Sequence, residues 1–215
     1  TSRKTNPKPA GKKGMLIAFE GIDGSGKSTQ ARMLYKHLQG KGVPVWLTAE
    51  PTSNQIGTLI RQGFSGELHF DHRTIAGLFV ADRLDHILNP EFGMKSKVDQ
   101  GFIVICDRYY LSSFAYQGSH MPMKWVMQAN SLAMDLLKPD LTIFIDVPAK
   151  LAMQRIHENR SSTELYETEK NLRKVKSNYK AAIALRERSE RIVSLSGKEN
   201  IDTLHRKILS LVDFA

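Results

Sequence analysis

Short apolar runs alternate with amphipathic segments along most of the chain. The apolar runs predict five strands, at 15–20, 43–48, 102–106, 141–145 and 192–195. Helical spacing predicts helices at 27–39, 72–88, 110–137 and 148–157, a helix followed by a turn at 53–66, a helix after the polar stretch that ends at 164, and a last helix from 201 onward. Strands that are apolar on both faces and alternate with helices favour an α/β fold, in which helices cover both sides of a parallel sheet.

Individual positions refine three of these helices. The segment 110–137 is expected to form two pieces, broken near Pro122. The helix that follows the polar stretch carries one apolar face, formed by Leu172, Val175, Tyr179 and Ala182. The last helix is marked by Ile201, Leu204, Ile208 and Leu211. Each set recurs every three or four residues, which is the spacing of one buried helix face.

The pattern predicts a single folded domain over 15–215. The chain shows no repeat of 20–50 residues and no internal linker. Residues 1–14 lack periodicity, and their Pro, Lys and Gly content predicts a disordered basic tail. The polar stretch at about 158–166 carries no core pattern, so we expect a mobile lid there.

Composition narrows the class of protein. The 215 residues are 41% hydrophobic and 25% charged, which is ordinary for a globular protein and excludes disorder of the whole chain. The single cysteine, Cys106, excludes a disulfide scaffold and is expected to be a small buried side chain. No apolar run approaches the ~20 residues of a membrane span, and the first 14 residues show no signal peptide. We therefore expect a cytoplasmic protein without a membrane partner.

The formal charge of +9 is unevenly distributed. More than half of the excess lies in the tail, in Arg3, Lys4, Lys8, Lys12 and Lys13. The mildly basic remainder suits anionic small molecules as well as it suits nucleic acid.

A complete phosphate-binding loop (P-loop) follows the first predicted strand. The motif G-x-x-x-x-G-K-[ST] is formed by Gly21, Ile22, Asp23, Gly24, Ser25, Gly26, Lys27 and Ser28. Its glycines let several N–H groups converge on a phosphate chain, and the helix N-terminus favours negative charge. With Thr29, these residues are predicted to bind ATP, with Lys27 at the β- and γ-phosphates and Ser28 as a ligand of Mg²⁺.

Asp107 and Arg108 directly follow the third predicted strand. Because the carboxyl ends of parallel strands meet at one edge of a sheet, both side chains should lie near the P-loop. Asp107 is predicted to hold Mg²⁺ directly or through water, and Arg108 can bind a phosphate through two hydrogen bonds. The chain lacks the N-K-x-D motif of GTP switches and the length of a helicase. A small phosphoryl-transfer enzyme remains.

Further segments give the sequence a specific resemblance to the thymidylate kinase family. They are FEGIDGSGKSTQ (19–30), EP (50–51), IR (60–61), LFVADR (78–83), DRYYLSSFAYQG (107–118), IDVP (145–148), R-x-x-x-x-R (155–160) and ELYE (164–167). The resemblance implies a P-loop kinase fold with a five-stranded parallel sheet in the order 2-3-1-4-5. It also implies transfer of the γ-phosphoryl group of ATP to the 5′-phosphate of dTMP, for dTTP synthesis. Such enzymes are usually homodimers that pack helices side by side, so a homodimer is expected here, and the apolar helix around 75–88 is the candidate for its interface.

The resemblance also implies which residues bind the base and sugar of the acceptor. Phe79 should stack on thymine, and Arg83, four residues later on the same helix face, should contact the base or its phosphate. Ser113 and Gln117 match hydrogen-bonding partners of the base edge. Tyr116 matches the residue that crowds the 2′ position and favours deoxyribose.

Other matched residues are charged. Arg61 and Arg108 are candidates for gripping the acceptor phosphate, Asp23 matches an acid near the acceptor sugar and magnesium, and Glu50 matches the acid of the EP pair. Some family members carry a catalytic arginine inside the P-loop, where this chain has Gly24. This chain therefore resembles members whose catalytic arginine comes from the lid, and the candidates are Arg155 and Arg160, with Arg160 favoured.

The loop around residues 49–54 departs from the family pattern. Three functions other than thymidylate kinase also stay open. Ala49 stands where an arginine often precedes EP, and residues 52–54 replace a frequent Gly-Gly pair, which leaves the contacts of that loop undefined. A deoxynucleoside kinase would need a carboxylate base, for which Glu50 is the candidate. A non-catalytic nucleotide-binding regulator would hydrolyse ATP slowly without using an acceptor. A nucleic-acid-binding protein would depend on tail residues 1–13.

Overall fold

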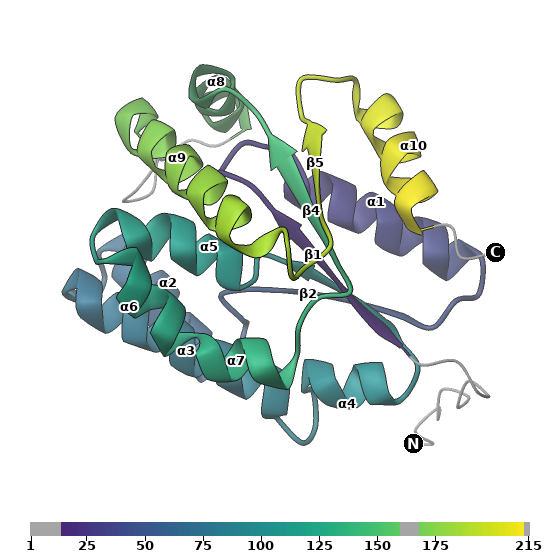
Figure 1. Cartoon of the computed structure of the whole chain (residues 1–215), viewed down its shortest axis with the longest axis horizontal. Helices are drawn as coiled ribbons and strands as arrows, with labels where there is room; N and C mark the ends of the chain where they lie inside the picture. The colour runs from purple at the N-terminus through teal and green to yellow at the C-terminus, as the bar shows by residue number, and fades with distance from the viewer. Residues whose placement is uncertain (1–13, 160–167, 213–215) are drawn as a thin grey trace.

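The computed structural model describes residues 14–159 and 168–212 (Figure 1). Its centre is a five-stranded parallel sheet with the predicted order β2-β3-β1-β4-β5. The strands are β1 Met15–Glu20, β2 Val45–Ala49, β3 Ile103–Asp107, β4 Leu141–Asp146 and β5 Ile192–Ser196. The predicted α/β class is confirmed. The predicted tail lies outside the described residues except for Gly14, and so does the lid from 160 onward.

Helices cover both faces of the sheet. They are α1 Lys27–Gly40, α2 Gln55–Ser65, α3 His72–Leu88, α4 Met94–Asp99, α5 Tyr110–Tyr116, the 3₁₀ helix η1 Gln117–Ser119, α6 Met123–Ala129, α7 Ser131–Leu136, α8 Ala149–Asn159, α9 Glu169–Arg186 and α10 Ile201–Val212. Helices α1 and α10 lie side by side on one face, and α3, α4, α5 and α9 lie on the other (Figure 1).

Alternation along β1 divides the core into two clusters. Ile17 and Phe19 pack toward α1 and α10, whereas Leu16 and Ala18 pack toward the opposite helices. All four side chains are almost fully buried. A central strand buried on both faces produces the continuous apolar run seen in the sequence.

Three local predictions differ from the structure. The segment 110–137 breaks near Pro122 as expected, but it breaks again at Asn130, whose side chain binds both the carbonyl of Val126 and Arg83. The short helix α4 was not predicted. Ile201, predicted to mark the buried face of α10, is 56% exposed, and the buried side chains of α10 are Leu204, Ile208 and Val212.

The carboxyl ends of three neighbouring strands bring the P-loop, Glu50 and Asp107 to one edge of the sheet. Strand β1 ends at the P-loop, β2 at the cis Glu50–Pro51 bond, and β3 at Asp107. In the sheet register, Asp107 lies opposite both Phe19 and Ala49. This edge is where ligands bind in open α/β sheets. Every helix in the described parts of the chain is too short or too polar to cross a membrane.

Candidate active site

Two glycines of the P-loop adopt a backbone conformation that residues with side chains rarely adopt. Gly24 and Gly26 have positive φ angles of 73° and 92°, which favour glycine. A Cβ atom on Gly24 would also lie 2.3 Å from the carbonyl oxygen of Ala152 in α8. Position 24 therefore has no room for an arginine, so a catalytic arginine has to come from another segment.

Lys27 is the first residue of α1 and is held close to the loop. Its side chain is 6% exposed, and its Nζ lies 3.5 Å from the Ile22 carbonyl oxygen and 3.7 Å from a carboxylate oxygen of Asp23. Burial lowers the pKa of the Lys27 ammonium group, and the nearby charge of Arg108 lowers it further. An anionic ligand beside Lys27 would reverse this shift, because opposite charges stabilise the protonated form.

A pocket of about 630 Å³ lies over the P-loop. Its walls include the predicted loop residues Asp23, Gly24, Ser25, Gly26, Lys27, Ser28 and Thr29. Arg155 of α8 also lines it, and its Nη2 donates to the Gly197 carbonyl at 2.9 Å. Gly21 and Ile22 support the loop from outside these walls, through carbonyl oxygens that accept hydrogen bonds from Arg108 and Lys27, respectively.

The end of β3 offers a fit for a divalent cation. Oδ1 of Asp107 is buried, and the described residues give it no hydrogen-bonding partner. Ser28 lies in the first turn of α1 and lines the P-loop pocket. A carboxylate oxygen and a hydroxyl are ligands that Mg²⁺ prefers, so the chemistry of these two residues fits the predicted ion. Ser28 lines the P-loop pocket, and Asp107 is not among the residues that line it.

A second pocket, of about 210 Å³, adjoins the first. It is lined by eight of the predicted residues: Asp23, Glu50, Arg61, Phe79, Arg83, Arg108, Tyr116 and Gln117. Pro51, Phe64 and Ser112 line it as well. The rings of Phe64 and Phe79 lie 5.9 Å apart and give the pocket an apolar wall. This size and lining suit a flat ring that carries an anionic group.

Arg83 and Glu50 form a buried ion pair at the wall of this smaller pocket. Each side chain is 1% exposed, and the Arg83 Nε and Nη2 groups both donate to Glu50 Oε2, at 2.9 and 2.5 Å. Arg83 Nη1 donates to Ser113 Oγ at 2.9 Å and to Asn130 Oδ1 at 2.5 Å. These bonds use four of the five guanidinium N–H groups, which leaves one N–H on Nη2 for a ligand.

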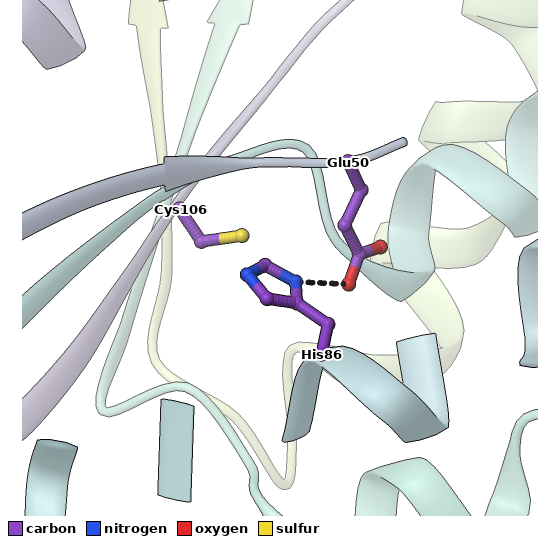
Figure 2. A group of neighbouring side chains, drawn as sticks. All are labelled: Glu50, His86 and Cys106. Carbon is purple, nitrogen blue, oxygen red and sulfur yellow. Dashed lines mark hydrogen bonds and ion pairs between the residues drawn. The ribbon is translucent and has the colours of Figure 1, made fainter. Parts of the chain in front are cut away.

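Glu50, His86 and Cys106 form a buried cluster next to the same pocket (Figure 2). Their potential ligand atoms lie within 4.8 Å of one another, as at a metal site. Each atom already has a hydrogen-bonding partner: Glu50 Oε1 lies 3.1 Å from His86 Nδ1, His86 Nε2 lies 2.7 Å from Thr48 Oγ1, and the Cys106 thiol donates to the Arg108 carbonyl. Burial raises the pKa of the Cys106 thiol well above its usual range. The cluster therefore holds Glu50 in place and does not resemble a metal centre.

Arg108 and Asp23 lie where the two pockets meet, since both residues line both pockets. Arg108 Nη2 forms an ion pair with Asp23 Oδ1, and the Tyr116 hydroxyl donates to Asp23 Oδ2 at 2.7 Å. The Arg108 guanidinium also lies 4.9 Å from the centre of the Tyr116 ring. Arg108 has a φ angle of 72°, a strained conformation for a residue with a side chain. Such strain is common at functional sites.

The two residues predicted to bind the base edge differ in position. Gln117 lines the smaller pocket and is 5% exposed, and its buried Oε1 has no hydrogen-bonding partner in the described part of the chain. Ser113 lies behind Arg83, whose Nη1 it binds, and not in the pocket wall. Gln117 can therefore accept a hydrogen bond from a ligand, whereas Ser113 supports Arg83.

Sequence reasoning missed a fully buried carboxylate beside the P-loop, that of Glu20. Its Oε1 accepts hydrogen bonds from the backbone N–H groups of Tyr109 and Ser112, and its Oε2 accepts from the hydroxyls of Ser112 and Tyr179. Burial raises the pKa of Glu20, and these hydrogen bonds oppose the rise. The network connects the P-loop strand with α5 and α9. The sequence gives one sign of Glu20, which is an acidic residue at the end of an apolar strand.

The favoured lid arginine, Arg160, lies outside the described residues, as does the ELYE segment. Arg155 of the same R-x-x-x-x-R spacing does line the P-loop pocket. Of the two predicted arginines, the structure therefore gives a position only for Arg155.

Comparison with known proteins adds an independent finding. Residues 19–208 match the sequence profile of the family described as thymidylate kinase. The chain is 37% identical to a probable thymidylate kinase of Pyrococcus horikoshii, over 93% of this chain and 96% of that protein. It is 34% identical to a probable thymidylate kinase of Thermococcus kodakarensis, over 93% and 97% of the two chains. It is also 35% identical to a thymidylate kinase of Thermosipho africanus, over 93% and 98%.

Proposed function

The chain belongs to the thymidylate kinase family, and from this premise we propose that it transfers the γ-phosphoryl group of ATP to the 5′-phosphate of dTMP, giving dTDP and ADP. The observation that carries the proposal is the pair of adjoining pockets. The P-loop lines one of them, an aromatic wall and a buried arginine line the other, and Asp23 and Arg108 line both. Such a pair suits two nucleotides whose phosphates meet.

The chemistry requires charge and position, and it does not require a general base. A nucleotide phosphate has a second pKa of about 6, so the acceptor is already mostly dianionic at pH 7. Lys27 and Arg155 would offset the negative charge of the donor phosphates, and Arg108 that of both nucleotides. When bound by Ser28 and Asp107, Mg²⁺ would supply further neutralisation of the phosphate oxygens.

Recognition of thymine would depend on three groups of the smaller pocket. Phe79 offers a ring face for stacking. The remaining N–H of Arg83 Nη2 can donate to the carbonyl O4 of the base, and Gln117 Oε1 can accept from N3–H. Cytosine carries an amino group at position 4 and an acceptor at N3, so it would present the wrong partner to both groups. The arrangement therefore favours dTMP over dCMP.

Deoxyribose and the phosphate would be bound at the other end of the pocket. Tyr116 would crowd the 2′ position while its hydroxyl remains bound to Asp23. Arg61 and Arg108 would grip the 5′-phosphate. Arg160 would be brought onto the transferring phosphoryl group when the lid closes, and closure would also exclude water.

The alternative, a deoxynucleoside kinase with Glu50 as base, is not favoured. Both oxygens of Glu50 are already engaged, one by Arg83 and the other by His86. A carboxylate that neutralises a buried guanidinium cannot take up a proton without leaving that charge uncompensated.

Two further proposals concern the setting of the enzyme. We propose a homodimer in which α3 packs against its counterpart, as the family resemblance implies, and Leu88 of α3 is 52% exposed, as such an interface requires. Sedimentation at micromolar concentration tests this, and a sharp monomer peak would contradict it. We also propose a cytoplasmic location, where ATP is abundant and the Cys106 thiol stays reduced.

A coupled assay of ADP release tests the main proposal. ATP and Mg²⁺ are supplied with dTMP, dUMP, dCMP, AMP or thymidine, and one reaction contains no acceptor. We expect turnover with dTMP well above that with dCMP, AMP and thymidine. Faster turnover with thymidine than with dTMP would restore the deoxynucleoside kinase. ADP release that no acceptor accelerates would indicate a nucleotide-binding protein.

A further inference from the structure

The loop that follows β2 is fixed to α3 at two points. The backbone N–H of Thr52 donates to Asp82 Oδ2 at 2.8 Å, and its hydroxyl donates to Asp82 Oδ1 at 2.5 Å. Asp82 is fully buried and Thr52 is 5% exposed. Both oxygens of one carboxylate therefore hold a single residue of the loop, which leaves that residue little freedom to move.

The carbonyl oxygen of Thr52 faces the other way, toward α2. It accepts a hydrogen bond of 2.5 Å from Arg61 Nη1. The same guanidinium donates to the Pro51 carbonyl at 3.1 Å and to the Thr58 hydroxyl at 3.1 Å. Helix α2 packs tightly here, since a Cβ on Gly57 would lie 2.0 Å from the Thr52 oxygen. An exposed arginine is thus held in one orientation by a rigid loop, at a wall of the smaller pocket.

Asp82 lies directly before Arg83 in α3, and Phe79 lies one turn earlier. Phe79 and Arg83 line the pocket themselves. One helix therefore positions two pocket groups directly and a third, Arg61, through Asp82 and Thr52. The spacing between the proposed base-binding groups and the proposed phosphate-binding group is set by α3.

We propose that Thr52 and Asp82 are positioning residues that aim Arg61 at the 5′-phosphate of the acceptor, and so make the pocket selective for nucleotides over nucleosides. The proposal rests on the function proposed above. A guanidinium that is already oriented loses less conformational freedom when it binds a phosphate than a mobile one does. Disordering Arg61 should therefore weaken the binding of phosphate-bearing ligands alone.

The test compares Thr52→Val with Thr52→Ser by calorimetric titration of dTMP and of thymidine. Valine keeps the shape of threonine but lacks the hydroxyl that binds Asp82, and serine keeps that hydroxyl. We expect Thr52→Val to raise the Kd for dTMP about tenfold, equivalent to about 1.4 kcal/mol, and the KM for dTMP by a similar factor. We expect the Kd for thymidine and kcat to change less than about twofold. Thr52→Ser should retain wild-type affinity.

A double-mutant cycle shows whether the effect passes through Arg61. In an Arg61→Ala background, Thr52→Val should cause no further loss of dTMP affinity. A full additional tenfold loss in that background would overturn the proposal, and so would a wild-type Kd in Thr52→Val. If the melting temperature shows that Thr52→Val is unfolded, the affinities for dTMP and thymidine are measured for Asp82→Asn instead. Wild-type protein that neither binds nor phosphorylates dTMP would instead overturn the proposed function.

Discussion

The buried Arg83–Glu50 pair makes a quantitative prediction for the variant Glu50→Gln. Glutamine keeps the shape of the side chain but removes the charge that neutralises Arg83. Removing one partner of a buried ion pair costs about 3–5 kcal/mol, because the other charge stays buried. Glutamine retains one carbonyl oxygen, which can still accept hydrogen bonds from Arg83. We therefore expect a loss near the lower limit, about 3 kcal/mol.

Urea unfolding followed by circular dichroism measures this loss. With a slope of about 2 kcal/mol per molar urea, a loss of 3 kcal/mol moves the midpoint by roughly 1.5 M. The matched control is Glu169→Gln, which breaks an ion pair with Arg173 whose side chains are 41% and 69% exposed. An exposed pair of this kind contributes about 0.3–0.5 kcal/mol, so its midpoint should move by less than about 0.3 M.

Ligand binding provides a second measurement for the Glu50→Gln variant. Arg83 is proposed to meet the base, so Glu50→Gln should weaken dTMP and thymidine by similar factors. The Thr52→Val variant, by contrast, should weaken dTMP alone. Equal midpoint shifts for Glu50→Gln and Glu169→Gln would refute the reasoning, since they would mean that Arg83 does not depend on a buried counter-charge.

Four further variants test other parts of the site. Arg160→Ala should lower kcat at least ~10²-fold with little change in the KM for dTMP, because a lid arginine acts on the transferring group; unchanged turnover removes that role. Gln117→Leu should raise the KM for dTMP about tenfold, through loss of one hydrogen bond to the base, and equal kinetics would contradict this. Gly24→Ala should abolish ADP binding in a calorimetric titration, because its Cβ would overlap the Ala152 carbonyl oxygen. Tyr179→Phe removes only a buried hydroxyl and should cost about 1 kcal/mol in urea unfolding, whereas an unchanged midpoint would show that the hydroxyl is not needed.

The strands and the P-loop could be predicted because their signals are local. A central strand is an uninterrupted apolar run, and the loop is defined by glycines and a lysine at fixed spacing. The predicted burial of Leu172, Val175, Tyr179 and Ala182 along α9 is confirmed for the same reason. In each case the information lies within about ten residues of chain.

The second break in 110–137 could not be predicted, because its cause is distant in sequence. Asn130 interrupts the helices where it accepts a hydrogen bond from Arg83, 47 positions earlier. Glu20 was missed on the same ground: its partner Tyr179 lies 159 positions later. The Thr52–Asp82 contact spans 30 positions. Such pairs become visible only when the sheet and its helices bring them together.

Helix α3 departs from the usual apolar pattern of a buried helix face, and the departure lies next to the site. Its buried face includes Asp82, Arg83 and His86, whereas its apolar Leu88 is 52% exposed. Polar and charged side chains are rarely fully buried without a hydrogen-bonding partner, and here each of the three has a partner from the segment 48–52. Along this turn, hydrogen bonds to the segment 48–52 therefore replace apolar packing, and they fix that segment beside the pocket. Polar residues at the core positions of a predicted helix thus point to the elements that position a binding site, even when their partners cannot be found in the sequence.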